Sequence, residues 1–169
     1  MEVDHLFEIG DKIVYPMHGA GVIKAIEEKE IQGKTQQYFI MVFPVRKLQL
    51  MLPIAKMDDS GMRLVLNMTA IEKVMDMFRQ GEIDRSLTYK QRYKINTDKM
   101  KTGKTQDGAE VIRDLMLVKK EKALNSNEKM MLREAMQFLI SELELSNSMT
   151  EMQAADLLND RLNVEKDAG

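Results

Sequence analysis

The sequence predicts an α+β protein, with a small β-barrel in the first third followed by a bundle of helices. Proline is the first indication, because all three prolines of the 169 residues lie within the first 53. Aromatic residues are the second, since five of the nine occur between residues 7 and 43. The third is the change after residue 53, where polar helix caps begin to precede apolar residues spaced three and four apart. We therefore expect strands first and helices afterwards.

Four segments of the first third are expected to be β-strands. Each contains β-branched or aromatic residues and is bounded by glycine, proline or charged residues. Gln32-Gly33-Lys34 marks a hairpin turn between the second and the third strand. Four or five short strands within about fifty residues are typical of a small SH3-like or Tudor-like barrel. The strands are predicted at residues 12–15, 21–31, 36–43 and 48–52.

Helix signals follow one another from residue 69 onward. Thr69 with Glu72 fits a capping box, and so do Asn125 with Glu128 and Ser148 with Glu151. Glycine at 81 and at 103 would end the first two helices, of which the second covers roughly 86–102 and the third is expected at about 107–122. The helix after Asn125 carries the clearest apolar stripe, formed by Met131, Leu132, Ala135, Met136, Leu139, Ile140 and Leu143. The result is a compact bundle of about five helices.

These elements divide the chain into three parts. A β module is predicted at residues 1–57, a short connector at 58–67 and a helical domain at 68–165. The connector contains one glycine and no proline, so its composition does not mark a loose linker. Rigid and flexible docking of the two modules are both compatible with this connector.

Charge is distributed unevenly along the chain, although the formal net charge is only −2. Residues 79–133 contain fourteen basic and eight acidic residues, a net charge of +6. Residues 134–169 contain two basic and eight acidic residues, a net charge of −6. The basic segment predicts contact with a polyanion such as nucleic acid, although a solvated lysine-rich face is the alternative. The acidic segment would solvate the last helices or screen the basic face.

The residue types present give little support for an enzyme. Cysteine is absent, which excludes disulfides, thiolate metal sites and cysteine nucleophiles, and the only histidines are His5 and His18. His18 is interpreted as a turn residue, and Gly19-Ala20-Gly21 is too short for a dinucleotide fingerprint. We expect no catalytic residue, cofactor, metal or small-molecule substrate. No apolar run reaches the roughly 20 residues of a membrane span, and the acidic start lacks a secretion signal, so a cytoplasmic protein without membrane contact is expected.

Residues 7–23, which read Phe7-Glu8-Ile9-Gly10-Asp11 and continue to Gly21-Val22-Ile23, resemble the opening of the CarD/CdnL family of bacterial transcription regulators. The same module, a polymerase-interacting domain, occurs in the transcription-repair coupling factor. Three later segments look like the helical domain of the CarD/CdnL family in the same order and at similar spacing: 92–96, 110–115 and 127–132. A coupling-factor fragment would continue into helicase motifs, so the resemblance implies a CarD/CdnL protein.

The resemblance implies that the β module binds the β subunit of RNA polymerase, partly by adding a strand edge to edge. It places Lys29, Ile31 and Met51 at positions that face the polymerase. The family more often has a basic residue where this chain has Met51. The ionic part of that contact is therefore expected to be weaker here or to be supplied by Arg46 or Lys47. The helical module is implied to contact promoter DNA at the upstream edge of the transcription bubble and to modulate the stability of the open promoter complex.

The predicted DNA-binding residues are Tyr89, Lys90, Arg92, Lys94 and Lys129. Arg92, Lys94 and Lys129 match basic DNA-facing positions of the family, where phosphate contacts give affinity with little sequence choice. Tyr89 aligns with the family's tryptophan, which wedges into the minor groove, and its smaller ring implies a weaker wedge. Tyr89 and Tyr93 are four residues apart and could instead pack together in the bundle, where Tyr93 is expected in either case.

Two functions follow from this interpretation. The first is a non-enzymatic regulator, associated with RNA polymerase on the nucleoid, that binds polymerase and promoter DNA and tunes the open complex. The second is an adaptor that docks on polymerase and binds another protein through its helices. Salt dependence separates them, because contact with four to six phosphates predicts a slope of roughly −4 to −5 for log K against log salt.

Overall fold

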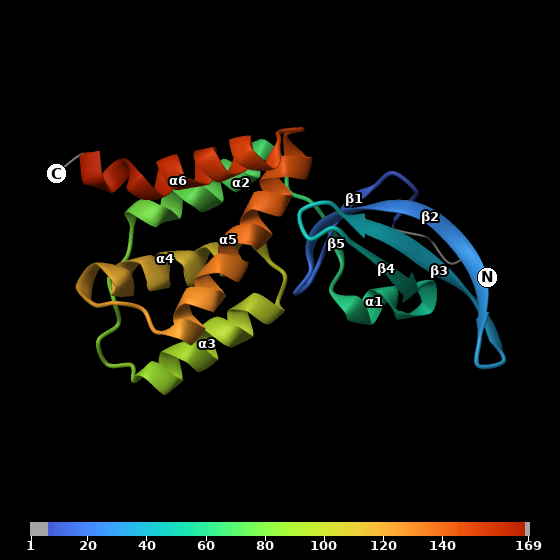
Figure 1. The fold of residues 1–169 in the computed structure, drawn as a ribbon, viewed down its shortest axis with the longest axis horizontal. Helices are drawn as coiled ribbons and strands as arrows, with labels where there is room; N and C mark the ends of the chain where they lie inside the picture. The colour runs from blue at the N-terminus through green and yellow to red at the C-terminus, as the bar shows by residue number, and fades with distance from the viewer. Residues whose placement is uncertain (1–6, 168–169) are drawn as a thin grey trace.

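The computed structural model describes the backbone of residues 7–167 and the side chains of residues 7–163, and it has an antiparallel sheet followed by helices (Figure 1). The strands are β1 (Lys12–Tyr15), β2 (Gly19–Ile31), β3 (Lys34–Phe43), β4 (Leu48–Pro53) and β5 (Arg63–Leu64). The predicted α+β class is therefore confirmed, and the four predicted strands occur with small shifts at their ends. The first six residues of the predicted 1–57 module lie outside the described residues.

The sheet is open, so the predicted small SH3-like or Tudor-like barrel is wrong in that the barrel is not closed. Its strand order is β4-β3-β2-β1-β5, which leaves β4 and β5 as separate edges. Closure fails because β5 has two residues and pairs with β1 alone among the described strands, through Ile13 opposite Leu64 and Val14 opposite Arg63. β4 pairs only with residues 38–43 of β3, so the far end of the β2–β3 hairpin projects beyond the sheet (Figure 1).

One face of the sheet carries the core of the β module. Ile13, Ile23, Phe39, Met41, Phe43 and Leu52 are buried there together with Phe7, Met57 and Met62. The 3-10 helix η1 (Ile54–Lys56) and the helix α1 (Met57–Ser60) cover this face. Gly21 is required beneath Phe43, because a Cβ atom at this position would lie 2.6 Å from the carbonyl oxygen of Val42 and 2.7 Å from the Phe43 ring.

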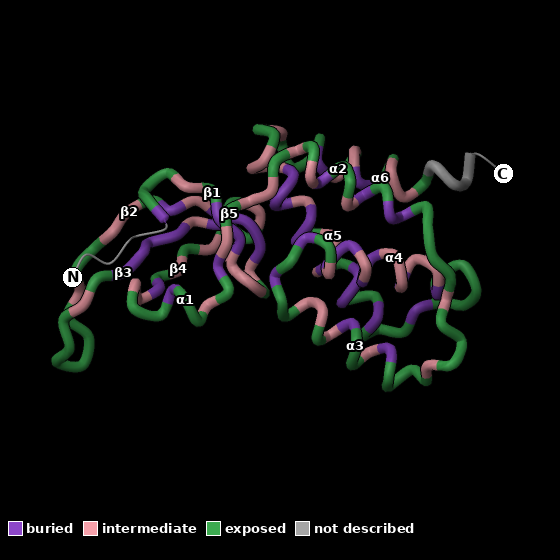
Figure 2. The backbone as a smooth tube through the Cα atoms, turned by 180° about the vertical axis from the view of Figure 1, so that it is seen from behind, coloured by how far each residue is buried: buried purple, intermediate pink, exposed green. Residues whose placement is uncertain are grey.

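The helices after the sheet are α2 (Met68–Asp76), α3 (Tyr89–Lys101), α4 (Thr105–Glu121), α5 (Ser126–Ser146) and α6 (Glu151–Asp167), and the 3-10 helix η2 (Met77–Arg79) follows α2. These five α-helices are the number predicted for the bundle, and α1 beside the sheet brings the described residues to six α-helices in all. Their core is a single apolar cluster with α4 and α5 at its centre. Figure 2 shows buried positions along these two helices and exposed ones at the tip of the β2–β3 hairpin.

Helix caps were predicted with mixed success. The capping box of α5 is confirmed, since Asn125 and Glu128 exchange hydrogen bonds of 2.9 and 3.0 Å. At α2 the side chain of Asn67 accepts from the backbone of Ala70, so Thr69 lies inside the helix. At α6 the reciprocal pair is Thr150 with Gln153, because Ser148 has a left-handed φ of 49° and does not have the extended backbone of an N-cap.

Residues 58–67, predicted as a connector, contain most of α1 and the whole of β5. This segment therefore belongs partly to the sheet, and the domain boundaries themselves stay a prediction. Among residues 7–167 no helix has the length and apolar character needed to cross a membrane.

Candidate functional site

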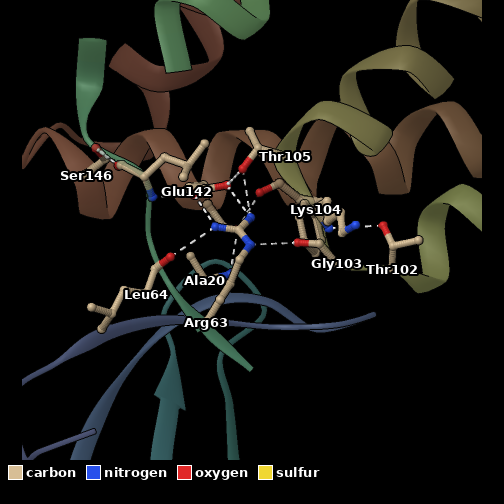
Figure 3. A network of polar contacts seen from close by, with 12 residues as sticks. Ala20, Arg63, Leu64, Thr102, Gly103, Lys104, Thr105, Glu142 and Ser146 are labelled. Carbon is tan, nitrogen blue, oxygen red and sulfur yellow. Dashed lines mark hydrogen bonds and ion pairs between the residues drawn. The ribbon is translucent and has the colours of Figure 1, made fainter. Parts of the chain in front are cut away.

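A buried polar network joins the sheet to the helices (Figure 3). Arg63 on β5 forms two hydrogen bonds with Glu142 on α5, at 2.8 and 2.9 Å. The carboxylate of Glu142, whose side chain is 0% exposed, also accepts from the Thr105 hydroxyl at 2.6 Å and from the backbone N–H of Leu66 at 2.8 Å. Because a buried carboxylate is stable only when it is paired and hydrogen-bonded, these contacts fix where α5 lies relative to β5.

A second set of contacts reinforces this junction. The backbone N–H of Ala20 donates to the Ser141 hydroxyl at 2.9 Å, and that hydroxyl donates to the carbonyl oxygen of Phe138 at 2.6 Å. A Cβ atom on Gly19 would lie 2.8 Å from the Ser141 oxygen, so only glycine allows this close approach. Val14, Ala20 and Phe138 form a small apolar cluster beside these bonds. The two modules therefore pack directly against each other. These contacts favour rigid docking over flexible docking.

The face of the sheet opposite the β-module core carries three of the predicted polymerase-binding residues. Side chains alternate between faces, and Met51 lies opposite Ile40 in the register while Lys29 lies opposite Gln36. Lys29, Ile31 and Met51 consequently share this face, which we call the outer sheet face. Ile31 and Met51 are each 43% exposed, and the Lys29 ammonium lies 3.4 Å from the carboxylate of Glu27.

Arg46, the fourth predicted polymerase-binding residue, lies at the other end of the sheet. It is exposed in the turn between β3 and β4, whereas Lys29 and Ile31 lie near the hairpin at the start of β3. The length of β3 separates these two positions by about 30 Å. β4 has no strand partner on its outer side among the described residues, so its backbone edge is free. The structure thus spreads the predicted residues along the sheet.

The predicted DNA-binding residues of α3 fall on different sides of that helix. Tyr89 begins the helix and is 39% exposed, with its ring centroid 5.9 Å from that of Tyr93. Tyr93 packs against the core cluster, as the sequence predicts. Lys90 and Lys94 are exposed on the outer side, where the Lys94 ammonium forms a 2.8 Å ion pair with Asp98.

Arg92 points into the helix packing and is only 9% exposed. Its guanidinium donates to Asp114 on α4 at 2.7 Å and to the carbonyl oxygen of Asp84 at 2.9 Å. The Asn96 amide donates to the other carboxylate oxygen of Asp114 at 2.9 Å. Arg92 therefore holds α3 against α4, and a DNA contact by its guanidinium stays a prediction that would require these bonds to be given up.

Lys129 lies in the first turn of α5 and is exposed. The preceding residue, Glu128, lines the same hollow of about 230 Å³ as Tyr89, so the start of α5 lies beside the start of α3. Tyr89, Lys90, Lys94 and Lys129 are exposed residues of two helices whose starts lie side by side, and we call these four residues the α3–α5 cationic face. Arg92 lies beneath it.

His18 lies in the turn between β1 and β2, as predicted. Its ring packs edge-on against Tyr15 at a centroid distance of 5.1 Å. Burial and repulsion from Arg46 lower the pKa of His18 below its ordinary value of 6.5, so the neutral imidazole is favoured. Within residues 7–163 no three histidine, aspartate or glutamate side chains gather in a way that could hold a metal ion.

Two family models match the chain, one over the sheet and the other over the helices that follow it. The model described as the CarD-like/TRCF RID domain matches residues 7–66, and the model of the CarD C-terminal domain matches residues 73–159. The chain belongs to the CarD/CdnL family. A relative from Bacillus subtilis (strain 168), named "Putative transcription factor YdeB", is 55% identical to this CarD-family chain over 148 residues, which are 88% of the chain and 97% of the relative.

Sequence reasoning missed the junction of this CarD-family protein. Glu142 carried a signal, because it follows Leu139 by three residues and therefore falls on the apolar side of α5. A carboxylate at a buried helix position implies a basic partner elsewhere in the chain. Nothing in the sequence identifies Arg63 as that partner, since the two residues are 79 positions apart.

Proposed function

We propose that this CarD-family protein is a non-enzymatic transcription regulator that binds RNA polymerase and promoter DNA together. The outer sheet face and the free edge of β4 would bind the polymerase β subunit, and the α3–α5 cationic face would bind DNA at the upstream edge of the bubble. Membership of the family and the printed name of the Bacillus relative support a role in transcription. Such a role would place the protein in the cytoplasm, with the polymerase.

The junction is the observation that carries this proposal. The Arg63–Glu142 pair and the Ala20–Ser141 bond hold the two surfaces in a fixed relation. A protein anchored on polymerase in this way presents its helices to nearby DNA at a high effective concentration, so each DNA contact can be individually weak. The protein then stabilises whichever promoter state gives the helices more contacts.

The polymerase contact is proposed to combine backbone and side-chain interactions. A free strand edge offers unpaired N–H and C=O groups to a strand of the partner, which provides affinity. Ile31 and Met51, each 43% exposed, would provide apolar contact and selectivity. Lys29 and Arg46 would provide the charge, at opposite ends of the sheet.

The DNA contact is proposed to be largely independent of sequence. Lys90, Lys94 and Lys129 would contact phosphates, and the exposed ring of Tyr89 would stack on or wedge beside a base at the bubble edge. A stacked aromatic ring contributes about 1 to 3 kcal/mol, and tyrosine is expected near the lower limit. Arg92 would act by positioning α3.

The lifetime of the open complex on a linear promoter with purified polymerase tests this function. We expect the intact protein to change the lifetime, Tyr89→Ala to reduce that effect, and the pair Lys94→Glu with Lys129→Glu to abolish it. The matched control is Lys56→Glu with Lys73→Glu, which makes the same charge change at two exposed lysines outside the predicted site. If the intact protein binds polymerase but leaves the lifetime of the open complex unchanged, the regulator proposal is contradicted and the adaptor function replaces it.

A further inference from the structure

An apolar groove runs between α4, α5 and α6, away from both proposed binding surfaces except at one residue. It consists of two adjoining hollows of about 530 and 420 Å³, which share Lys119, Leu132 and Met136. Apolar side chains form the floor, namely Met116, Leu124, Leu132, Met136, Ile140 and Leu162. We call this feature the α4–α6 groove.

Cations line both sides of the α4–α6 groove. Lys119 and Lys120 lie on the α4 side, and Lys129 and Arg133 lie on the α5 side. Among residues 7–163, none of those lining the two hollows is acidic. Within the described part of the chain, Lys119, Lys129 and Arg133 have no salt-bridge partner, and all three are exposed. The described lining of the groove therefore combines cationic side chains with an apolar floor.

We propose that the α4–α6 groove binds an acidic amphipathic helix of a partner protein. Leu132, Met136 and Ile140 follow one another every four residues, so the α5 part of the floor is a continuous apolar stripe. A helix with apolar residues at positions i, i+3, i+4 and i+7 fits such a groove. Acidic residues on both flanks of that stripe would then meet Lys119 on one side and Arg133 on the other.

The distribution of the cations favours a helix over other occupants. A fatty acid carries one anionic end, and it would be matched by cations at one end of the groove instead of along both sides. Nucleic acid phosphates would use the cations but leave the apolar floor without a partner. A peptide helix satisfies both features, because burial of its apolar stripe and contact with the cations occur at the same time.

Lys129 belongs both to this groove and to the α3–α5 cationic face. A helix bound in the groove would cover Lys129, so it would compete with promoter DNA. This step rests on the proposed function, whereas binding in the groove does not. The groove would then be a place where a partner protein weakens the hold of the regulator on DNA.

Fluorescence anisotropy with a labelled peptide of about 18 residues, long enough to form a helix on binding, tests the groove directly. The probe carries leucine at i, i+3, i+4 and i+7 and glutamate on both flanks, and a peptide with the same composition in scrambled order is its control. We expect Arg133→Glu and Met136→Glu each to weaken binding about tenfold. Their matched controls, Lys94→Glu and Met152→Glu, change exposed residues outside the groove and should leave binding unchanged.

Several results would overturn the proposal. These are equal binding of the scrambled peptide, equal loss in the groove variants and their controls, tight binding of a labelled fatty acid without the peptide, or self-association of the chain that Arg133→Glu abolishes. Circular dichroism of Met136→Glu checks its fold, and the exposed Arg133→Glu carries the test if that fold is lost. Groove-dependent peptide binding that does not displace DNA would support the groove proposal and count against Lys129 as a DNA contact.

Discussion

The two outward surfaces of the molecule offer different kinds of group to a partner. The β module presents the free edge of β4 and, on the outer sheet face, half-exposed apolar side chains and a Lys29 that is already paired with Glu27. The α3–α5 cationic face presents exposed ammonium groups and one tyrosine ring. Backbone edges and apolar contacts select another folded protein, whereas exposed cations select a polyanion. This difference supports the proposal that the two surfaces bind two classes of partner.

The junction between the two surfaces has the opposite character from both. Its charged and polar groups are buried or partly buried and hydrogen-bonded, with Glu142 bound by three separate groups. Exposed groups at the surfaces are accessible to a partner, and hydrogen-bonded groups at the junction keep those surfaces in a fixed relation. The predictions below test this contrast, beginning with the junction, where the largest effect is expected.

Glu142→Ala should lower the free energy of unfolding by about 3 kcal/mol, because it leaves Arg63 and the Leu66 N–H partly buried without their acceptor. Urea unfolding followed by circular dichroism measures the change. Glu121→Ala is the matched control, since it removes a glutamate bound by Arg85 on the surface, where the two side chains are 43% and 74% exposed. That control should cost less than about 1 kcal/mol. Equal costs for the two variants would contradict the contrast between junction and surface.

The salt dependence of DNA binding should separate the two surfaces. Lys94→Ala and Lys129→Ala should each reduce the slope of log K against log salt by about 0.9, the value for one lost phosphate contact. Each substitution should also weaken DNA binding a few-fold at 0.1 M salt. The effect of Lys94→Ala should be the smaller, because Lys94 already forms an ion pair with Asp98. Met51→Ala, on the outer sheet face, should change neither quantity. A Met51→Ala variant with a smaller slope would show that the sheet also contacts DNA.

The parts of the fold that depend on local sequence were predictable. The β-branched and aromatic strand segments, the Gly33 turn and the capping box of Asn125 all act within a few residues, and each has the predicted place. Closure of the barrel was not predictable, because it depends on whether distant strands pair. β5 has two residues, and no local pattern in the predicted connector distinguishes it from a loop.

The exposure of single residues in the candidate site could not be predicted from local sequence either. Arg92 and Lys94 are two positions apart on one polar helix, yet Arg92 is buried and Lys94 is exposed. The cause is Asp114, which lies on the next helix and binds the guanidinium at 2.7 Å. A helix with few apolar residues gives no stripe from which to predict its buried side, so exposure had to come from the tertiary structure.

The smallest expected effect is a pH dependence of the free energy of unfolding. It arises from His18, which is next to the junction residues Gly19 and Ala20 in the sequence. The pKa of His18 is lowered in the folded state, so below pH 6.5 the unfolded chain binds more protons at this residue than the folded one. The free energy of unfolding should therefore decrease as the pH falls below 6.5, towards the lowered pKa of the folded state. In His18→Gln this decrease should be smaller, and His5→Gln, compared in the same urea titrations between pH 5 and 7, shows how much of the slope the other histidine contributes. A wild-type slope retained in full by His18→Gln would mean that the pKa of His18 is not lowered in the folded state.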